Sequence, residues 1–369
     1  MLYADEYIQD IEVLSPVHMS DVSGRIKIRV RSRCFTCLEA RCIEPLTPDG
    51  IHLNRKGEGS FTIDTRSLPQ GPVTIQIIGS NASGQRDIYE LQLYNTDGRA
   101  SRFSGIPDTI PAPAEGMRLV FADDFDGPLS ISRDGRGTRY NAHKPRFGDF
   151  SGWPFADPTA DEEGPFRQRD TYLVIQARKP AGSNGFTGLL ATVDMDGNGF
   201  WAKAPFYMEC RLVAQSAPGT WPAFWTVTNI DRGPGDELDV VEAYGGWGKG
   251  NPGSSGYWVT THYWGQADED GRPLEAPARL IDMDKMGRHT SWSQEFHTYG
   301  LAVEKEWTTY YLDNEPVLQH PTNRYSFENP HVVMVNYAIG GASGWRIDLD
   351  RYANGSNMYV DYIRVFQAD

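Results

Sequence analysis

Four acidic residues crowd one short segment of the sequence, GDELDVVEAYGG, which is otherwise rich in strand-forming residues. They are Asp236, Glu237, Asp239 and Glu242. Because side chains of a strand point alternately to its two faces, Glu237 and Asp239 share one face and Glu242 falls on the other. A β-bulge between Asp239 and Glu242 would return Glu242 to the acidic face, and bulges are common beside active sites. The segment therefore predicts a bulged strand on which three acids converge.

Two carboxyl groups about 5 to 5.5 Å apart can cleave a glycosidic bond by double displacement. With the bulge, the backbones of Glu237 and Glu242 would lie about 13 Å apart, and a curved sheet would let their long side chains meet. Glu237 would then attack the anomeric carbon, and Glu242 would protonate the leaving oxygen and afterwards activate water. Asp239 would hydrogen-bond Glu237 and keep the protonation states of the pair apart. A solvated sheet face or a set of calcium ligands is the alternative interpretation.

Composition excludes two broad classes of partner. The chain of 369 residues carries a net charge of −14, which repels a polyphosphate, so we expect no nucleic-acid binding. No apolar run approaches the ~20 residues that span a bilayer, so we expect no membrane span. Aromatic residues make up 12% of the chain, with ten Trp and eighteen Tyr. Aromatic rings are natural platforms for the flat apolar faces of sugars.

The cysteines and the first residues bear on the cellular compartment. Cys34, Cys37, Cys42 and Cys210 do not form the paired spacing of a zinc site, and one disulfide or free thiols remain alternatives. The opening MLYADEYIQD has no signal-peptide pattern. We expect an extracellular or secreted protein whose signal has been removed or whose export takes another route. A virion-borne or cytoplasmic protein is the alternative.

The chain divides into two strand-rich regions without helical periodicity. Short strand-like runs fill residues 7–94, a segment rich in Gly, Pro and small polar residues follows, and further apolar runs continue to the C-terminus. We predict an N-terminal β-sandwich over 1–96, a linker over 97–116 and a catalytic domain over 117–369. So many strands without βαβ alternation predict an all-β fold, with a large antiparallel β-sandwich or jelly roll preceded by a smaller β-sandwich.

The sequence ELDVVE resembles the ExDxxE signature of glycoside hydrolase family 16, and other segments are similar to strands of the same family. These are FADDFDG (121–127), WPAFW (221–225), FHTYGLAVEKEWTTYYLDN (296–314), VNYAIGG (335–341) and MYVDYIRVFQ (358–367). The resemblance covers about 117–369 and implies a concanavalin-like jelly roll. It also implies a retaining endo-β-glycosidase with nucleophile Glu237, assisting acid Asp239 and acid/base Glu242, and no cofactor for catalysis. A transglycosylase and a non-catalytic lectin-like protein are the alternatives.

Further residues are candidates for substrate binding. Trp221 and Trp225 lie an even number of residues apart and would both face the groove, with core packing as the alternative. His262 and Trp264 fall on the next predicted groove strand, and the resemblance places His262 near Glu242. On the same logic we predict contacts from Asn336, Trp345 and Trp247. Asp361 corresponds to a position that helps bind a structural calcium in relatives, with a hydrogen-bonded surface carboxylate as the alternative.

The remaining expectations concern the first domain and the substrate. The segment FTIDTRSLPQGPVTIQIIGSNASGQRDIYELQLYN resembles bacterial immunoglobulin-like modules. Its domain lacks Trp, so we expect a structural or positioning role in preference to carbohydrate binding. The substrate would be a polysaccharide, namely a β-glucan, a galactan or a bacterial exopolysaccharide, and the protein a monomer. Loops set the choice of glycan in the family, and those of this chain match no subgroup.

Overall fold

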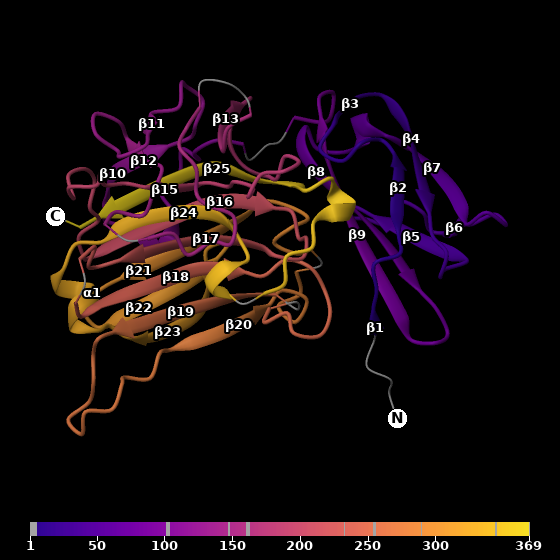
Figure 1. Ribbon diagram of the computed structural model, residues 1–369. Helices are drawn as coiled ribbons and strands as arrows, with labels where there is room; N and C mark the ends of the chain where they lie inside the picture. Colours follow the sequence, from indigo (N-terminus) through magenta and orange to yellow (C-terminus); the bar gives the residue numbers. More distant parts are fainter. Residues whose placement is uncertain are drawn as a thin grey trace.

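The computed structural model describes residues 6–100, 104–146, 148–159, 163–231, 233–253, 256–288, 290–343 and 345–368. Two β-sandwiches lie side by side, with β1–β9 in one and β10–β25 in the other (Figure 1). The predicted all-β fold is confirmed. Within the described residues the one α-helix is α1 (Arg324–Glu328), so no helix is long and apolar enough to cross a membrane.

The N-terminal sandwich has a six-stranded and a three-stranded sheet. In the larger sheet the strand order is β1 (Glu6–Tyr7), β9 (Gln85–Asn95), β8 (Gly71–Ser80), β5 (Cys37–Arg41) and β6 (Ile51–His52), with β3 (Asp21–Val22) also on β9. The smaller sheet is β2 (Glu12–Ser15), β4 (Arg25–Arg31) and β7 (Glu58–Asp64). The core lies between them because β4 alternates exposed basic residues with buried Ile28 and Val30. Its likeness to immunoglobulin-like modules stays a prediction.

The large sandwich has two eight-stranded sheets. One runs β13 (Phe166–Arg169), β14 (Tyr172–Arg178), β25 (Gly355–Gln367), β16 (Phe206–Ala214), β21 (His297–Val303), β22 (Trp307–Leu312) and β23 (Glu315–Pro321), with β10 (Arg118–Asp123) also on β25. The other runs β11 (Ile131–Ser132), β12 (Tyr140–Asn141), β15 (Leu189–Ala191), β24 (Val332–Ile339), β17 (Thr220–Val227), β18 (Gly235–Ala243), β19 (Gly256–Trp264) and β20 (Ala278–Asp282). Pairing is antiparallel except between β11 and β12.

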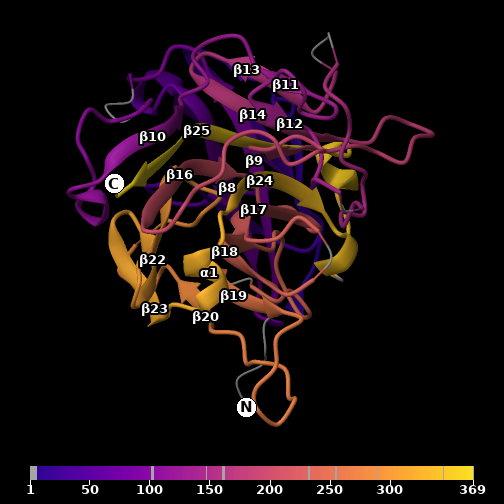
Figure 2. The ribbon, with the colours of Figure 1, turned by 90° about the vertical axis from the view of Figure 1, so that its left-hand side faces the viewer.

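Four short 3-10 helices complete the secondary structure of the described residues: η1 (Thr65–Ser67), η2 (Ala112–Ala114), η3 (Gly341–Ser343) and η4 (Asp350–Tyr352). Figure 2 shows the strands of the large sandwich closer to end-on, with β16 and β22 in one layer and β17, β18 and β19 in the other. Between the layers, Leu238 of β18 is buried in the same core as Tyr257 and Leu301. One face of β18 is thus committed to the core, and its other face is left for the acids.

Buried polar contacts join the two sandwiches. The carboxylate of Glu90 in β9 is fully buried and accepts hydrogen bonds from Gln76 Nε2 at 2.7 Å, Ser293 Oγ at 2.7 Å and the Ser216 backbone N–H at 2.9 Å. Two of these three donors belong to the large sandwich. Burial raises the pKa of Glu90, and the hydrogen bonds oppose the rise. Removing a donor would leave a buried oxygen unsatisfied, so the interface favours one relative placement of the sandwiches.

An ion pair reinforces the same interface. Arg351 Nη1 lies 2.9 Å from both carboxylate oxygens of Asp87, and Arg351 Nη2 donates to the Ile88 carbonyl at 2.7 Å. The predicted linker also packs on the large sandwich, because Arg364 Nη1 donates to the carbonyls of Pro107 and Thr109 at 3.1 Å. The boundaries 1–96, 97–116 and 117–369 stay predictions, and residues 1–5 and 101–103 lie outside the described residues. All four cysteines are free thiols.

Candidate active site

A β-bulge in β18 brings the acids to one face. Between the pairs Asp239–Thr260 and Glu242–Trp258, two residues of β18 stand opposite the single Val259 of β19. The pairing of β18 with β17 shifts at the same place. The predicted bulge is therefore confirmed. Its consequence is that Glu237, Asp239 and Glu242 all line one groove of about 640 Å³.

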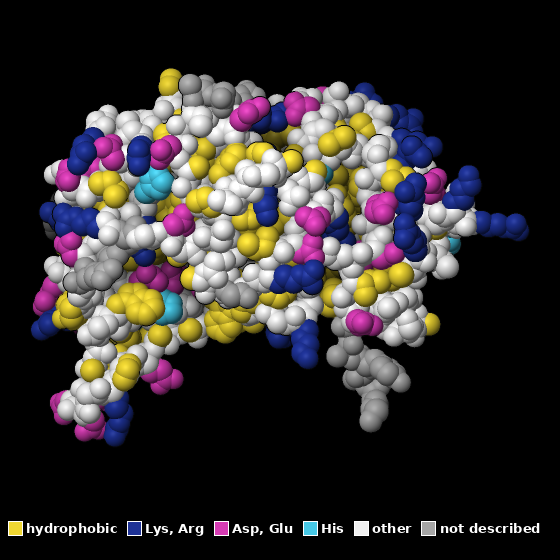
Figure 3. Space-filling model, in the orientation of Figure 1, with side chains coloured by type: hydrophobic (Ala, Val, Ile, Leu, Met, Phe, Trp, Pro, Cys, Tyr) yellow, Lys and Arg dark blue, Asp and Glu magenta, His cyan; other side chains and the backbone are white. Residues whose placement is uncertain are grey.

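The groove collects several of the predicted substrate-binding residues. Trp221, Trp225, Trp264 and Asn336 line it together with the three acids. They come from neighbouring strands of one sheet, since β24, β17, β18 and β19 are adjacent. In Figure 3, acidic, histidine and hydrophobic side chains gather on the corresponding face of the large sandwich, at the left of the view. An exposed aromatic ring can stack on the apolar face of a sugar, and neighbouring carboxylates can hydrogen-bond the hydroxyl groups of that sugar.

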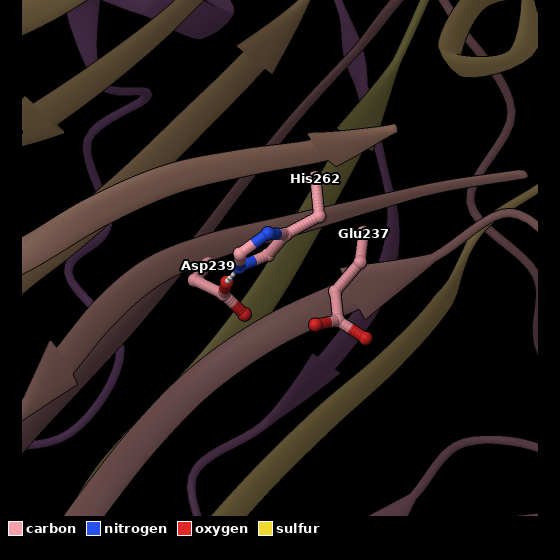
Figure 4. A group of neighbouring side chains, drawn as sticks. All are labelled: Glu237, Asp239 and His262. Carbon is pink, nitrogen blue, oxygen red and sulfur yellow. Dashed lines mark ion pairs between the residues drawn. The ribbon is translucent and has the colours of Figure 1, made fainter. Parts of the chain in front are cut away.

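Asp239 is bonded to His262. His262 Nε2 lies 3.3 Å from Asp239 Oδ2, and one carboxylate oxygen each of Glu237 and Asp239 and one ring nitrogen of His262 lie within 4.8 Å of one another (Figure 4). Burial raises the pKa of Asp239 to about 8; the charges of Glu237 and Glu242 add to the rise, and His262 opposes it. The hydrogen bond that His262 donates to Asp239 raises the pKa of His262. The pair therefore retains at least one proton near neutral pH.

Glu242 has its own hydrogen-bond donors. Tyr244 Oη donates to Glu242 Oε1 at 2.7 Å, and Trp221 Nε1 donates to the same oxygen at 3.1 Å. Burial raises the pKa of Glu242, while these two donors pull it down. A carboxyl group with a raised pKa is suited to deliver a proton to a leaving oxygen. Glu242 therefore combines a raised pKa with two hydrogen-bond donors of its own.

Some aromatic side chains of the groove are packed against other side chains, and one is largely exposed. Trp225 is buried, donates through Nε1 to Asn336 Oδ1 at 2.8 Å, and has Lys144 Nζ 4.9 Å from its ring. Trp221 stacks on Tyr244 with ring centroids 5.8 Å apart. Trp264 is 52% exposed and stacks on His262 at 4.9 Å. Trp264 is therefore the aromatic with most surface free for a sugar, and Trp225 orients Asn336.

The sequence prediction missed several residues of the groove, among them Tyr244 and Lys144. Tyr244 lies two positions after Glu242, and the alternation of side chains was a signal that could have found it. Lys144 comes from an irregular segment, and no pattern in the sequence links it to the acids. Burial lowers the pKa of Lys144, and the charges of Glu237 and Asp239 oppose that shift. Both residues line the groove and enlarge the set of polar groups that meet a substrate.

Three predicted residues lie away from the groove. Trp247 and Trp345 line a second cleft, at the junction of the two sandwiches. Asp361 is buried, where it pairs with Arg211 Nη1 at 2.5 Å and accepts from the Gly105 backbone N–H at 2.8 Å. Calcium binding by Asp361 stays a prediction, and a cation there would compete with Arg211 for the carboxylate.

Comparisons with known sequences point to one enzyme family. Residues 200–364 match the model of glycosyl hydrolases family 16. Endo-1,3-1,4-beta-glycanase ExsH of Rhizobium meliloti is 29% identical over 224 residues, covering 58% of this chain and 42% of the relative. Beta-glucanase of Rhodothermus marinus is 25% identical over 217 residues, covering 53% of this chain and 68% of the relative. The chain thus spans less than half the length of the first of these relatives.

Solved structures match in fold. SCLam, a non-specific endo-beta-1,3(4)-glucanase from family GH16, aligns with a TM-score of 0.53 at 23% identity, covering 72% of this chain and 96% of that chain. Endo-beta-1,3-glucanase from Pyrococcus furiosus aligns with a TM-score of 0.50 at 19% identity, covering 71% of this chain and 98% of that chain. The family match over residues 200–364 and the related glycanases support a glycosyl hydrolases family 16 domain in this part of the chain, and the solved structures share its fold.

Proposed function

We propose that this protein is an endo-acting glycoside hydrolase that cleaves internal β-glycosidic bonds of a polysaccharide with retention of configuration. The observation that carries the proposal is the bulge in β18, which places Glu237 and Glu242 on one face of one groove. The related glycanases and glucanases support the endo mode and the polysaccharide substrate.

In the proposed mechanism, the Glu237 carboxylate attacks the anomeric carbon while Glu242 gives its proton to the leaving oxygen. This leaves a covalent glycosyl–enzyme ester on Glu237 and an ionised Glu242. Glu242 then takes a proton from water, whose oxygen attacks the same carbon and releases Glu237. Tyr244 and Trp221 hydrogen-bond the ionised form of Glu242 between the two steps. Asp239, held by His262, positions the nucleophile and keeps a proton beside it.

The glycan that the relatives favour is a β-glucan with 1,3 or 1,4 linkages, since their names specify these bonds. A galactan or a bacterial exopolysaccharide is the alternative substrate, because loops set the choice of glycan. Transfer to a sugar hydroxyl in place of water is the alternative outcome of the second step. Mass analysis of products from a panel of β-glucans, galactans and exopolysaccharides separates these possibilities.

The first prediction tests the nucleophile. Replacing Glu237 with Gln is expected to lower kcat at least about a thousandfold, because no carboxylate remains to attack. The melting temperature should stay unchanged or rise slightly, since one negative charge leaves a crowded acidic group. The Glu304→Gln variant is the matched control, because Glu304 is exposed in the turn between β21 and β22. Full activity of Glu237→Gln on the substrate of the wild-type protein would refute the assignment.

We also propose an extracellular place of action and a monomeric state, which suit an enzyme that attacks a large polymer. Light scattering during gel filtration tests the monomer, and assay of culture medium against cell extract tests the location. A mass of two or more chains, or activity confined to the cell, would contradict these proposals.

A further inference from the structure

A cleft of about 700 Å³ lies between the two sandwiches, beside the buried contacts that join them. We refer to it as the interdomain cleft. Three of its aromatic side chains come from both sides: Tyr7 from β1, and Trp247 and Trp345 from loops of the large sandwich. Figure 3 shows hydrophobic and basic side chains at the surface along the junction. A concave surface lined with flat aromatic rings can bind a ligand through an apolar face of that ligand.

The wall that carries Tyr7 is held in place. Strand β1 pairs with β9 in the register Tyr7–Arg86, and the Arg86 guanidinium lies 6.0 Å from the centre of the Tyr7 ring. Strand β9 also carries Asp87 and Glu90, which are bound to the large sandwich through buried contacts. The position of Tyr7 relative to the large sandwich is therefore fixed by the interface and does not depend on a free linker.

The opposite wall is shaped to meet Tyr7. A Cβ atom on Gly248 would lie 2.9 Å from Tyr7 Cβ, and the φ of Gly248 is +106°, so only glycine fits this close approach. Beside it, the Trp247 ring is nearly parallel to the Tyr7 ring, at 14°, with centroids 6.4 Å apart. Trp345 Nε1 donates to the Gly245 carbonyl and ties the two loops together.

Both loops lead directly to the catalytic groove. One begins after Tyr244, whose hydroxyl donates to Glu242, so Trp247 lies five residues beyond the proposed acid and at most ~18 Å away along the chain. In the other, Ser343 lines the groove and Trp345 lines the interdomain cleft. A polysaccharide in the groove is therefore within a short reach of the cleft.

The charges of the cleft favour an uncharged ligand. Its basic side chains are Lys249, Arg346 and Arg351, and its acidic ones are Glu6, Asp87 and Asp348, so the two signs balance. Two of the basic groups are already paired, Arg351 with Asp87 at 2.9 Å and Arg346 with Asp348 at 2.5 Å. Neutral sugar rings that stack on aromatic side chains match this lining better than an anionic glycan does.

From these observations we infer that the interdomain cleft is a second glycan-binding site, which holds neutral sugar units of the same polysaccharide that the groove cleaves. The inference rests on the proposed function. It gives the N-terminal sandwich a direct role through Tyr7. The competing interpretation is that the cleft is a water-filled seam between two domains.

The test compares long and short substrates. Tyr7→Ala and Trp247→Ala should each raise KM for the polymer about five- to tenfold, the loss expected for one aromatic contact. Their kcat/KM for a tetrasaccharide of the same glycan should be unchanged, because so short a chain fills the groove alone. Tyr7→Phe should retain the wild-type KM. Trp307→Ala is the control, since Trp307 is exposed on β22 of the other sheet.

Footprinting of the intact Glu237→Gln protein provides a second readout that needs no cleft variant to fold. Hydroxyl-radical labelling of Tyr7 and Trp345 should fall when the polymer is bound and stay unchanged with the tetrasaccharide. An unchanged polymer KM in both alanine variants, an equal loss on both substrates, or labelling that does not respond to polymer would overturn the inference and leave the proposed function intact. If the wild-type protein cleaves no glycan of the panel, both fail together.

Discussion

Two glutamates, the fully buried Glu90 at the domain interface and the partly buried Glu242 in the groove, meet the cost of burying a carboxylate in different ways. Burial raises the pKa of both. Glu90 is closed off from solvent, and its two oxygens accept three hydrogen bonds. Glu242 has two donors, both on one oxygen, and opens onto a groove that it shares with Glu237 and Asp239.

The difference shows how burial serves stability in one place and chemistry in the other. At the interface, hydrogen-bond donors and counter-charges satisfy each buried carboxylate. Such a carboxylate is poorly suited to exchange a proton in a reaction, and removing it or its partner should weaken the fold. In the groove, burial and the neighbouring acidic charges raise the pKa values of Asp239 and Glu242, which costs stability but keeps protons where glycoside cleavage needs them. Substitutions of the interface residues should therefore lower stability, whereas substitutions of the groove acids should raise stability and lower activity.

The largest stability effect is expected from Arg351→Met at the interface. It leaves Asp87 as an unpaired buried charge, which costs about 3 to 5 kcal/mol of unfolding free energy. Urea titration followed by fluorescence measures this loss. Arg136→Met is the matched control, because Arg136 forms exposed ion pairs with Asp134 and Asp196 and should change little. An equal loss of unfolding free energy in the two variants would show that the interface ion pair contributes no more to stability than an exposed one.

A smaller effect of opposite sign is expected from Asp239→Asn in the groove. The folded-state pKa of about 8 exceeds the ordinary value of 3.8, so the folded protein binds more protons between these pH values and its stability falls as pH rises. The variant should be more stable than the wild-type protein at pH 8, with a flatter pH dependence and reduced activity. Thermal melts from pH 5 to pH 8 measure this.

Asp313→Asn serves as the control of opposite sign. The His297 contact at 2.9 Å and further donors lower the pKa of Asp313 despite its burial. Its ionised form therefore adds stability above the unfolded-state pKa, and this stability is lost as pH falls through the folded value. Asp313→Asn should thus lower stability at neutral pH. If both variants shift stability in the same direction, the distinction between satisfied and crowded acids is wrong.

The smallest effect is expected from Tyr244→Phe. Loss of the hydroxyl that donates to Glu242 disfavours the ionised form of Glu242 and raises its pKa further. The alkaline limb of the kcat/KM profile should move to higher pH, while kcat falls about three- to tenfold because the ionised intermediate loses a hydrogen bond. Tyr311→Phe, on β22 of the other sheet, should leave the profile unchanged. An unchanged alkaline limb would show that the pKa of Glu242 does not determine the loss of activity at high pH.

The acidic face was predictable because it depends on local rules. Side-chain alternation shows that Glu242 needs a bulge to join Glu237, and the structure has that bulge at the predicted place. The same alternation and the turn residues were enough for the all-β class. These features need only the neighbours of each residue in sequence.

Features that depend on distant segments were not predictable. Lys144 reaches the groove from an irregular loop, and Trp247 turns toward the N-terminal sandwich although it follows the catalytic strand closely. Glu90 lies in a strand buried on both faces, and one sequence does not reveal that a second sandwich supplies its partners. Each of these placements is decided by packing between elements far apart in the chain.

The most direct test of the central claim is to trap the covalent intermediate. An activated 2-deoxy-2-fluoro aryl β-glycoside of the glycan that the protein cleaves should transfer its fluorosugar to the wild-type protein and release the aryl alcohol, and peptide mass analysis should place the sugar on Glu237. Proton NMR of the normal reaction should show the β-anomer first. A sugar on Glu242, or an α-anomer as the first product, would contradict the account.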